Sequence, residues 1–362
     1  MIQLTRKREK ALVGLEIEAD SIAAAEVRVN GTSTLSTTAI APLPPGAFID
    51  GEVANPEALA EALSELFSSH KLSKRVRLGV GNQRVVVRTI RLPAIDDPKE
   101  LDAAVRFQAQ EQIPMPIDQV VLDHRVVGGI PATPESPAQI DVVVVAARRE
   151  MIEASLVPLK KAGLQPVGVD LSAFGLIRAL GDSTPAPTLV ERGDAAPAPS
   201  ATLYCNIGEG ANLAVARGRA CLFTRVAPAG LEGIAASLAG SAGLTLEHAR
   251  MWVKHVGLSQ PVDEIDGDRS VVTAARVAME AGASSLEDEL RLSLDFYGAQ
   301  EGAIPVDHVV LSGPGSGIAG LPERIEASLG LPLEVGCPQA LAGLDPASAA
   351  RLTLSYGLAL DS

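Results

Sequence analysis

The chain has 362 residues, of which 47% are hydrophobic and only 3% aromatic, and its formal net charge at pH 7 is −13. A protein that binds nucleic acid through the phosphate backbone needs a basic face, so this charge argues against nucleic acid as the main partner. The three cysteines include no CxxC pair, which argues against a metal centre or disulfide framework and favours a reducing compartment. We find no apolar run of ~20 residues and no signal-peptide pattern, and therefore expect a cytoplasmic protein.

The first 92 residues alternate between strand and helix patterns. Strands are predicted at 11–29, which contains a polar turn at Glu18–Ser21, and at 33–41, 76–81 and 84–92. The leucines that follow Pro56 recur at helical spacing and predict one helix between the second and third of these. We expect these elements to form the core of a first lobe.

Residues 93–163 predict a small α+β subdomain inserted into this lobe. A helix opens at Asp97-Pro98, which is an N-cap pattern, two apolar strands follow, and a second helix ends at Gly163. The next strand returns to the first lobe, to which we therefore assign 1–92 and 164–190. Residues 181–200 are rich in Pro, Ala and Asp and predict a mobile loop or linker.

Residues 201–346 predict a second lobe. It opens with YCNIGEGANLAVARGR, in which two apolar runs are joined by a glycine-containing turn. Helical patterns over about 231–300 predict a helical subdomain, and a strand at 306–312 leads into a glycine-rich segment. The last helix, 347–361, is expected to pack back onto the first lobe.

The opening of the second lobe repeats the opening of the first. Glu16 corresponds to Asn206 and Glu18 to Gly208, each 190 residues later in the chain. Glu16 and Asn206 lie near the ends of predicted strands, and Glu18 and Gly208 lie two residues further on, at the turns. The repeat predicts a duplicated α/β fold in which two hairpin turns flank a cleft between the lobes.

Both turns, and the glycine-rich segment SGPGS, have features that suit a nucleotide. Backbone N–H groups in a tight turn converge on an anion, and glycine lets a phosphate approach closely. A polar side chain at a strand end can hold a metal-bound water. The plain alternative is that each turn only reverses the chain. The candidate residues are Glu16, Ser21, Asn206, Gly208, Gly210, Asn212, Gly313, Gly315 and Ser316.

Three of these motifs resemble those of a known superfamily. Glu16-Ile17, Asn206-Ile-Gly208 and Ser312-Gly-Pro-Gly-Ser316 are similar to the two phosphate loops and the adenosine loop of actin, Hsp70 and sugar kinases. More narrowly, the chain resembles, over nearly its full length, the PilM family of actin-like cytoplasmic proteins of type IV pilus assembly. The segment ELDAAVRFQAQEQIPMPIDQVVLDHRVVG is the most specific and resembles that family's extra subdomain. The related cell-division actin homologue is a more distant likeness.

This resemblance implies an actin-like two-lobe α/β fold with duplicated cores and an inserted α+β subdomain. It also implies a cleft for ATP and Mg, and a groove between the first-lobe core and the subdomain that receives the N-terminal tail of a PilN-like inner-membrane protein. The membrane would then be reached only through that partner. The apolar loop Ile113, Pro114, Met115 and Pro116 is a candidate partner contact, and burial in the subdomain core is the alternative.

The sequence departs from the family pattern at the phosphate loops. Glu18 stands where the family has glycine, and Ala23 where it has lysine. Asn206 replaces an acid in the second loop, and Pro314 replaces a glycine in the third. A carboxylate beside phosphate oxygens adds repulsion and bulk, and the lost lysine removes a compensating cation. We therefore expect nucleotide binding to be weak or absent, unless Glu18 is merely an exposed turn residue.

Three functions follow from these patterns. The first is a scaffold without catalysis that binds an extended peptide partly through main-chain pairing. The second is an active ATPase that uses Glu16 and Asn206 to place metal and water, against the simpler interpretation of these residues as polar caps at strand ends. The third is a small-molecule kinase, which requires a catalytic aspartate that no motif in the sequence supplies.

Overall fold

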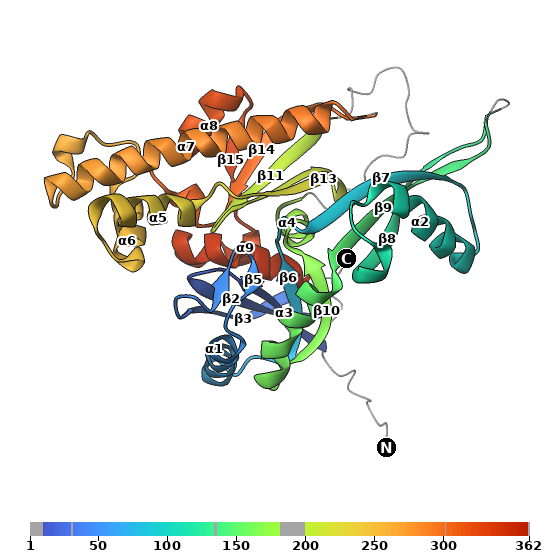
Figure 1. Cartoon of the computed structure of the whole chain (residues 1–362), viewed down its shortest axis with the longest axis horizontal. Helices are drawn as coiled ribbons and strands as arrows, with labels where there is room; N and C mark the ends of the chain where they lie inside the picture. The colour runs from blue at the N-terminus through green and yellow to red at the C-terminus, as the bar shows by residue number, and fades with distance from the viewer. Residues whose placement is uncertain (1–9, 30–31, 134–135, 182–199, 301, 361–362) are drawn as a thin grey trace.

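Two five-stranded sheets lie one above the other, and the last helix of the chain runs between them (Figure 1). They are seen in a computed structural model, which describes residues 10–29, 32–133, 136–181, 200–300 and 302–360. Most of the linker expected at 181–200 lies outside these residues. Among the described helices, none is both long enough and apolar enough to cross a membrane.

The first sheet has the strand order β10-β6-β1-β2-β3. Its strands are β1 (Lys10–Ile17), β2 (Ser21–Val29), β3 (Ser33–Pro42), β6 (Arg75–Val80) and β10 (Gln165–Leu171). The first three form an antiparallel meander, and β6 and β10 join it in parallel. The two parallel strands therefore end at the same edge as β1, which places the β1–β2 turn at the mouth of the cleft.

Two helices, α1 (Pro56–Ser69) and α3 (Arg149–Lys161), cover one face of this sheet. The side chain of Asn55 caps α1 by accepting from the N–H of Ala58 at 3.1 Å, and the leucines at helical spacing are buried. A short hairpin, β4 (Phe48–Ile49) with β5 (Glu52–Val53), precedes α1. Because Leu159 of α3 belongs to this core, α3 is part of the first lobe. The sequence analysis had placed this helix in the insert, and that assignment is wrong.

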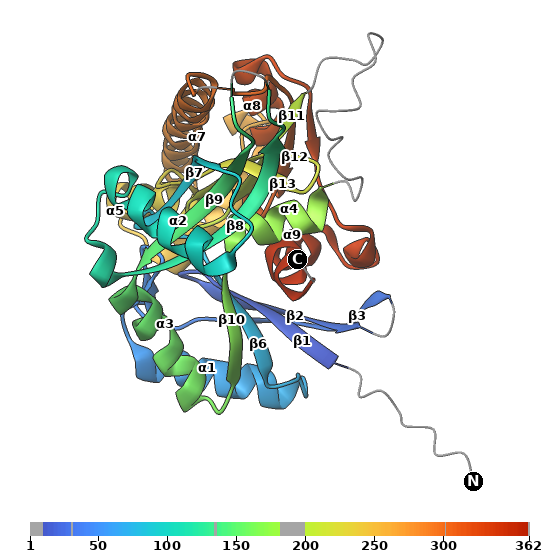
Figure 2. The same cartoon turned by 90° about the vertical axis from the view of Figure 1, so that its right-hand side faces the viewer.

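The insert is a three-stranded antiparallel sheet with one helix, and the view in Figure 2 faces it. It comprises β7 (Val85–Pro93), α2 (Pro98–Gln112), β8 (Val120–Ile130) and β9 (Gln139–Arg148), in the strand order β7-β9-β8. A single 3-10 turn, η1 (Ile117–Gln119), precedes β8. The boundary expected at residue 93 is therefore wrong, because β7 pairs with β9 along its whole length and leaves the first-lobe sheet.

The second sheet has the order β13-β12-β11-β14-β15. Its strands are β11 (Ala201–Ile207), β12 (Ala211–Arg217), β13 (Ala220–Ala227), β14 (Val306–Ser312) and β15 (Leu333–Val335). The helices of this lobe are α5 (Leu231–Ala242), α6 (Leu246–Val256), α7 (Arg269–Gly298) and α8 (Leu321–Leu329), with short 3-10 turns η3 (Val262–Glu264), η4 (Pro314–Gly317) and η5 (Gln339–Leu341). Helix α7 runs across the top of the lobe in Figure 1.

The two sheets have the same topology, which confirms the duplicated fold predicted from the repeat. In each, an antiparallel meander is extended by two parallel strands. The turns differ by one residue, because Ile17 pairs with Ile22 in the first lobe whereas Ile207 pairs with Ala211 in the second. The 190-residue spacing therefore relates β1 to β11 and the start of one turn to the start of the other, but it does not relate β2 to β12.

Two helices, α4 (Ser172–Leu180) and α9 (Pro346–Ala359), fill the space between the sheets. Glycines allow these close contacts, since a Cβ at Gly175 or Gly357 would overlap the other helix and one at Gly14 would overlap the backbone of α9. Because α9 packs on β1, β2 and β6, its polar side chains reach the β1–β2 turn.

Candidate functional site

The structure brings together Glu16 and Asn206, each of which is the last residue but one of its strand, β1 or β11. Glu16 is 8% exposed and Asn206 is 2% exposed, and both line one cavity of about 10 Å³. A cavity of this size is barely enough for one water molecule. Burial and the neighbouring charge of Glu18 raise the pKa of Glu16, so its neutral form is favoured.

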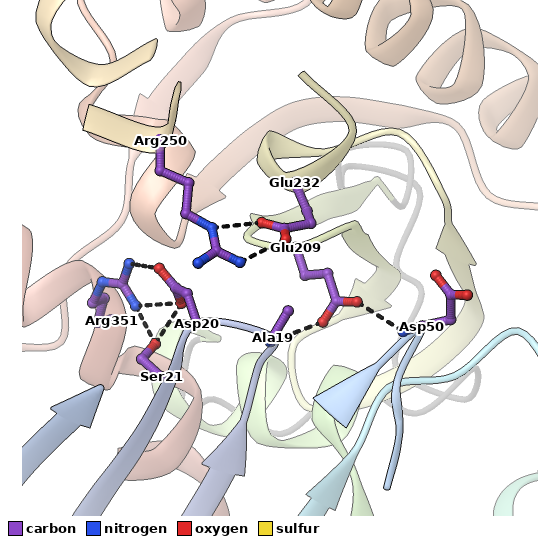
Figure 3. A network of polar contacts seen from close by, with 8 residues as sticks. All are labelled: Ala19, Asp20, Ser21, Asp50, Glu209, Glu232, Arg250 and Arg351. Atoms are coloured by element: carbon purple, nitrogen blue, oxygen red, sulfur yellow. Dashed lines mark hydrogen bonds and ion pairs between the residues drawn. The ribbon is translucent and has the colours of Figure 1, made fainter. Parts of the chain in front are cut away.

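An ion pair occupies the first hairpin turn (Figure 3). Arg351 of α9 donates to both carboxylate oxygens of Asp20, at 3.1 and 2.8 Å, and also donates to the hydroxyl of Ser21. That hydroxyl donates to Asp20 at 2.7 Å. Burial alone would raise the pKa of Asp20, but these hydrogen bonds and the Arg351 charge lower it to about 2. The hydroxyl of Ser21, a predicted phosphate contact, is thus already hydrogen-bonded within the first lobe.

Glu18 points from the first turn into the second. Its carboxylate lies beside Gly208, so close that a Cβ at position 208 would overlap it, and the nearby backbone N–H of Glu209 favours its charged form. Burial and the charge of Asp20 raise the pKa of Glu18 to about 7, against the opposing charge of Arg351. Glu18 is therefore an inward-pointing carboxylate and not an exposed turn residue.

Glu209, in the second turn, reaches in the opposite direction. Its Oε2 accepts the backbone N–H of Ala19 at 3.1 Å, and its Oε1 accepts that of Asp50 at 3.0 Å (Figure 3). Burial raises the pKa of Glu209, although these two hydrogen bonds favour its charged form. Asp50 has a positive φ of 52°, a strained conformation that aims its N–H at the second lobe.

The start of α5 offers further N–H groups, and two of them are already used. Leu231 donates to the carbonyl of Gly208 at 2.9 Å, and Glu232 donates to that of Glu209 at 3.4 Å. Gly230 permits this contact, because a Cβ there would overlap Gly210. The helix N-terminus, which commonly binds a phosphate, is therefore capped by the turn itself.

Carboxylates outnumber cations around the two turns. Arg250 of α6 forms a bidentate pair with Glu232, at 2.9 and 2.6 Å. With Lys254 and Arg351 it supplies three cations. The facing carboxyl groups are those of Glu16, Glu18, Asp20, Glu209 and Glu232. Several of these carboxyl groups have raised pKa values because they are buried, so their number exceeds their negative charge.

The predicted adenosine loop packs onto the second phosphate loop. Gly313 has a φ of +80°, and a Cβ there would lie 2.6 Å from the Asn206 side chain. Gly315 lies against Ile207 just as closely, and the Ser316 hydroxyl donates to the Gly313 carbonyl at 2.8 Å. These three residues form the predicted turn, and their contacts in the structure are internal ones.

The carboxylates divide the cleft into unequal cavities. On the side of α6, a cavity of about 30 Å³ has room for one or two waters. On the side of the β4–β5 hairpin, a cavity of about 720 Å³ is open, and Asn212 lines it against Gly81. Glu18, Glu209 and Glu232 line both cavities. Between the turns, the Glu209 carboxylate already accepts the N–H groups of Ala19 and Asp50, which are donors of the kind that bind a phosphate.

A separate groove runs between the insert and the lobes. It has a volume of about 450 Å³, and we call it the β8 groove. Its lining residues are Asp123, His124, Arg125, Val126, Val127, Val143, Val145, Asp170, Phe174, Ile177, Arg178, Arg219, Ala220 and Cys221. Because Ala220 and Cys221 belong to β13 and Arg219 to the turn before it, the groove is lined by both lobes and the insert.

The predicted partner loop is split between core and surface. Ile113 is 5% exposed and belongs to the core of the insert, whereas Pro114 and Pro116 are exposed. Met115 and Pro116 line a shallow hollow with Arg106 and Arg149, apart from the β8 groove. The predicted burial therefore holds for Ile113, and a partner contact by the exposed residues of the loop stays a prediction.

Sequence reasoning missed most of the charged groups at the cleft. Arg250 and Arg351 arrive from helices that are distant in the sequence, and nothing in their local pattern marks them. Glu209 could have been found, because it stands 190 residues after Ala19, to which it is bonded, and lies within the repeated turn.

Two lobes of identical sheet topology, joined by helices below a cleft with a hairpin turn from each lobe, define the actin-like fold. Solved structures with this fold include the ethanolamine utilization protein EutJ from Carboxydothermus hydrogenoformans (13% identity, 96% of this chain and 90% of that chain, TM-score 0.52). Another is MreB5 of Spiroplasma citri bound to ADP (12% identity, 96% and 94%, TM-score 0.51). At these identities the likeness concerns the fold alone.

The particular family is shown by two further comparisons. The family model described as type IV pilus assembly protein PilM matches residues 14–359, and the chain belongs to this family. A chain in a structure described as the PilM-PilN type IV pilus biogenesis complex is 28% identical, with a TM-score of 0.76 over 96% of this chain and 97% of that one. The resemblance noted in the sequence is thus confirmed.

Proposed function

We propose that the chain is a scaffold of a type IV pilus or related secretion platform, and that it binds the N-terminal cytoplasmic segment of a PilN-like inner-membrane protein. Family membership and the similar PilM-PilN complex support this role. The observation that carries the proposal is the β8 groove, because it offers an apolar wall and a strand edge to an extended peptide.

Strand β8 is the edge of the insert's sheet, with β9 on one side and no described strand on the other. Five consecutive β8 residues line the groove, and among them Val126 is 44% exposed and Val127 is 37% exposed. An unpaired strand edge presents N–H and C=O groups that an added strand can satisfy. Phe174 and Ile177 of α4 form the facing apolar wall. A peptide with alternating apolar side chains matches this arrangement.

The nucleotide cleft, in this proposal, is degenerate. The motive is the pair of inward carboxylates, Glu18 and Glu209, on the N–H groups that a triphosphate would use. ATP and Mg are then bound weakly or not at all, and the protein does not hydrolyse ATP. The nine candidate residues of the three loops keep a structural role in shaping the turns.

The protein acts, on this account, on the cytoplasmic side of the inner membrane and reaches the membrane through its partner. The acidic charge of −13 gives no support for nucleic acid as a partner. The same groove would serve a pilus, a secretion or a competence system, because main-chain pairing does not depend on the system.

Calorimetric titration with the N-terminal cytoplasmic peptide of the cognate PilN-like protein tests this role. We expect saturable one-to-one binding that Val126→Lys weakens by about tenfold or more, since a buried unpaired charge is costly. Val335→Lys is the matched control, because Val335 is 52% exposed on the edge strand β15 of the other lobe. No saturable binding by the wild type would count against the proposal.

The loop Ile113–Pro116 offers a second docking surface that the same titration separates. Met115→Lys changes the shallow hollow and leaves the β8 groove unaltered. A loss of affinity with this variant, together with normal affinity of Val126→Lys, would move the docking site to the loop. Steady ATP turnover that disappears in Asn206→Ala would instead favour an active ATPase.

A further inference from the structure

The two hairpin turns hold each other by reciprocal contacts. The Glu18 carboxylate of the first turn lies against Gly208 of the second, beside the N–H of Glu209, and Glu209 of the second turn accepts the N–H of Ala19 at 3.1 Å. Glu18 and Gly208, like Ala19 and Glu209, are equivalent positions of the internal repeat. We call the residues Glu18, Ala19, Asp50, Gly208 and Glu209 the clasp.

Glu209 is bound in the way that a separate anion would be. Two backbone N–H groups converge on its carboxylate from two different turns of the first lobe, those of Ala19 and Asp50. The Asp50 turn is held in place by Asn82, whose amide donates to the Asp50 carbonyl at 3.1 Å. Converging N–H groups of turns are a common anion site, and here the chain supplies the anion itself.

The hydrogen-bonded ion pairs of the cleft each lie within one lobe, although Arg250 and Lys254 also attract Asp20 across the cleft. Arg351 binds Asp20 of the first turn, and α9 packs on the first sheet. Arg250 binds Glu232, and both belong to helices of the second lobe. We therefore expect the separation of the two lobes to depend mainly on the Glu209 side chain.

The position of one lobe relative to the other also sets the width of the β8 groove. One side of this groove is formed by Arg219, Ala220 and Cys221 of the second lobe, with α4 packed against Cys221 in the same core, and the other side by the insert. We expect separation of the two lobes at the clasp to change the spacing between the insert and the second lobe. A device that fixes the lobes therefore also fixes the groove.

We propose that the clasp keeps the two lobes closed without any nucleotide, because Glu209 and Glu18 replace the bound anion, and that it thereby holds the β8 groove at its binding width. The part that concerns the groove rests on the proposed function. The part that concerns closure does not, and it can be measured on the chain alone.

Lobe separation is measured by pulsed electron spin resonance between one label on each lobe. Glu65→Cys on α1 and Ser237→Cys on α5 give exposed label sites, in a Cys337→Ser background that removes the exposed thiol. We expect one narrow distance distribution for the nucleotide-free protein. Glu209→Ala should broaden it and shift it to longer distances.

Glu232→Ala is the matched control, because it removes a carboxylate from the same cleft but breaks only a pair within the second lobe. It should leave the distribution narrow. Far-ultraviolet circular dichroism of each variant establishes that it is folded. Equal distributions for the wild type and Glu209→Ala would overturn the clasp, and so would equal broadening by Glu232→Ala.

The peptide titration then tests the link to the groove. Glu209→Ala should weaken peptide binding by about tenfold, a common size for coupling between two sites, and Glu232→Ala should not. If the wild type binds no peptide, the proposed function fails while the distance measurement still decides the clasp. If Glu209→Ala opens the lobes but binds normally, control of the groove by the clasp is refuted.

Discussion

Glu18→Gln should stabilise the folded protein, and by more as the pH rises. The substitution keeps the shape of the side chain and removes its charge. Burial and the charges of Asp20 and Glu209 raise the pKa of Glu18 from 4.5 to about 7, against the charge of Arg351 and the N–H of Glu209. The folded protein therefore binds this proton more tightly than the unfolded chain does.

The sign and size of the effect follow from this difference in pKa. A carboxyl group with a raised pKa lowers the free energy of unfolding as the pH rises from its unfolded to its folded pKa, here from 4.5 to about 7. Each pH unit is worth about 1.4 kcal/mol, which gives a total on the order of 3 kcal/mol. The advantage of Glu18→Gln over the wild type should grow by that amount and then stay constant.

Urea denaturation of both proteins at about pH 5 and about pH 8 measures this effect, since the two values bracket most of the titration. Glu61→Gln is the control, because Glu61 is an exposed residue on α1 and its loss should give no comparable trend. A difference between Glu18→Gln and the wild type that is the same at both pH values would refute the buried, charge-crowded position of Glu18.

Three further experiments with variants test the cleft. Gly208→Ala should lower the free energy of unfolding by about 1–3 kcal/mol, because the added methyl meets the Glu18 carboxylate. In a Glu18→Ala background the loss should be much smaller. Equal losses in the two backgrounds, measured by urea denaturation, would contradict that contact. Glu18→Gly with Glu209→Ala should bind ATP more tightly than either single variant by calorimetry, and unchanged affinity would place the block elsewhere. Ala23→Lys should lose more than about 2 kcal/mol in thermal unfolding, since Ala23 is 6% exposed beneath α9; wild-type stability would contradict this.

Local patterns predicted the elements well. The leucines of α1 and the capping residues before α2 were visible in the sequence, and both helices begin where those signals place them. The 190-residue repeat was sufficient to predict two equivalent sheets, because hairpins of the same kind pair their strands in the same antiparallel way.

The sheet that each helix or strand joins was harder to predict than the helix or strand itself. Helix α3 was expected in the insert, since its neighbours in the chain are there, yet its apolar face packs on the first-lobe core. Strand β7 was expected in the first lobe and pairs with β9 instead. A hydrophobic face indicates that an element is buried, but it does not indicate which sheet covers it.

The site shows the same limit. Glu18 was recognised because it replaces a glycine of a known loop. Arg351 was not, because its pairing with Asp20 joins residues at opposite ends of the chain. Long-range ion pairs leave no spacing signal in a single sequence, so the charges that balance the cleft became visible only in the fold.

Calorimetric titration of the purified wild-type chain with magnesium ATP tests most directly the central claim, that the carboxylates of the protein itself occupy the phosphate positions of the cleft. The account predicts no saturable heat at millimolar nucleotide. One-to-one saturable binding, with the triphosphate seated between the two turns in a crystal structure, would contradict it.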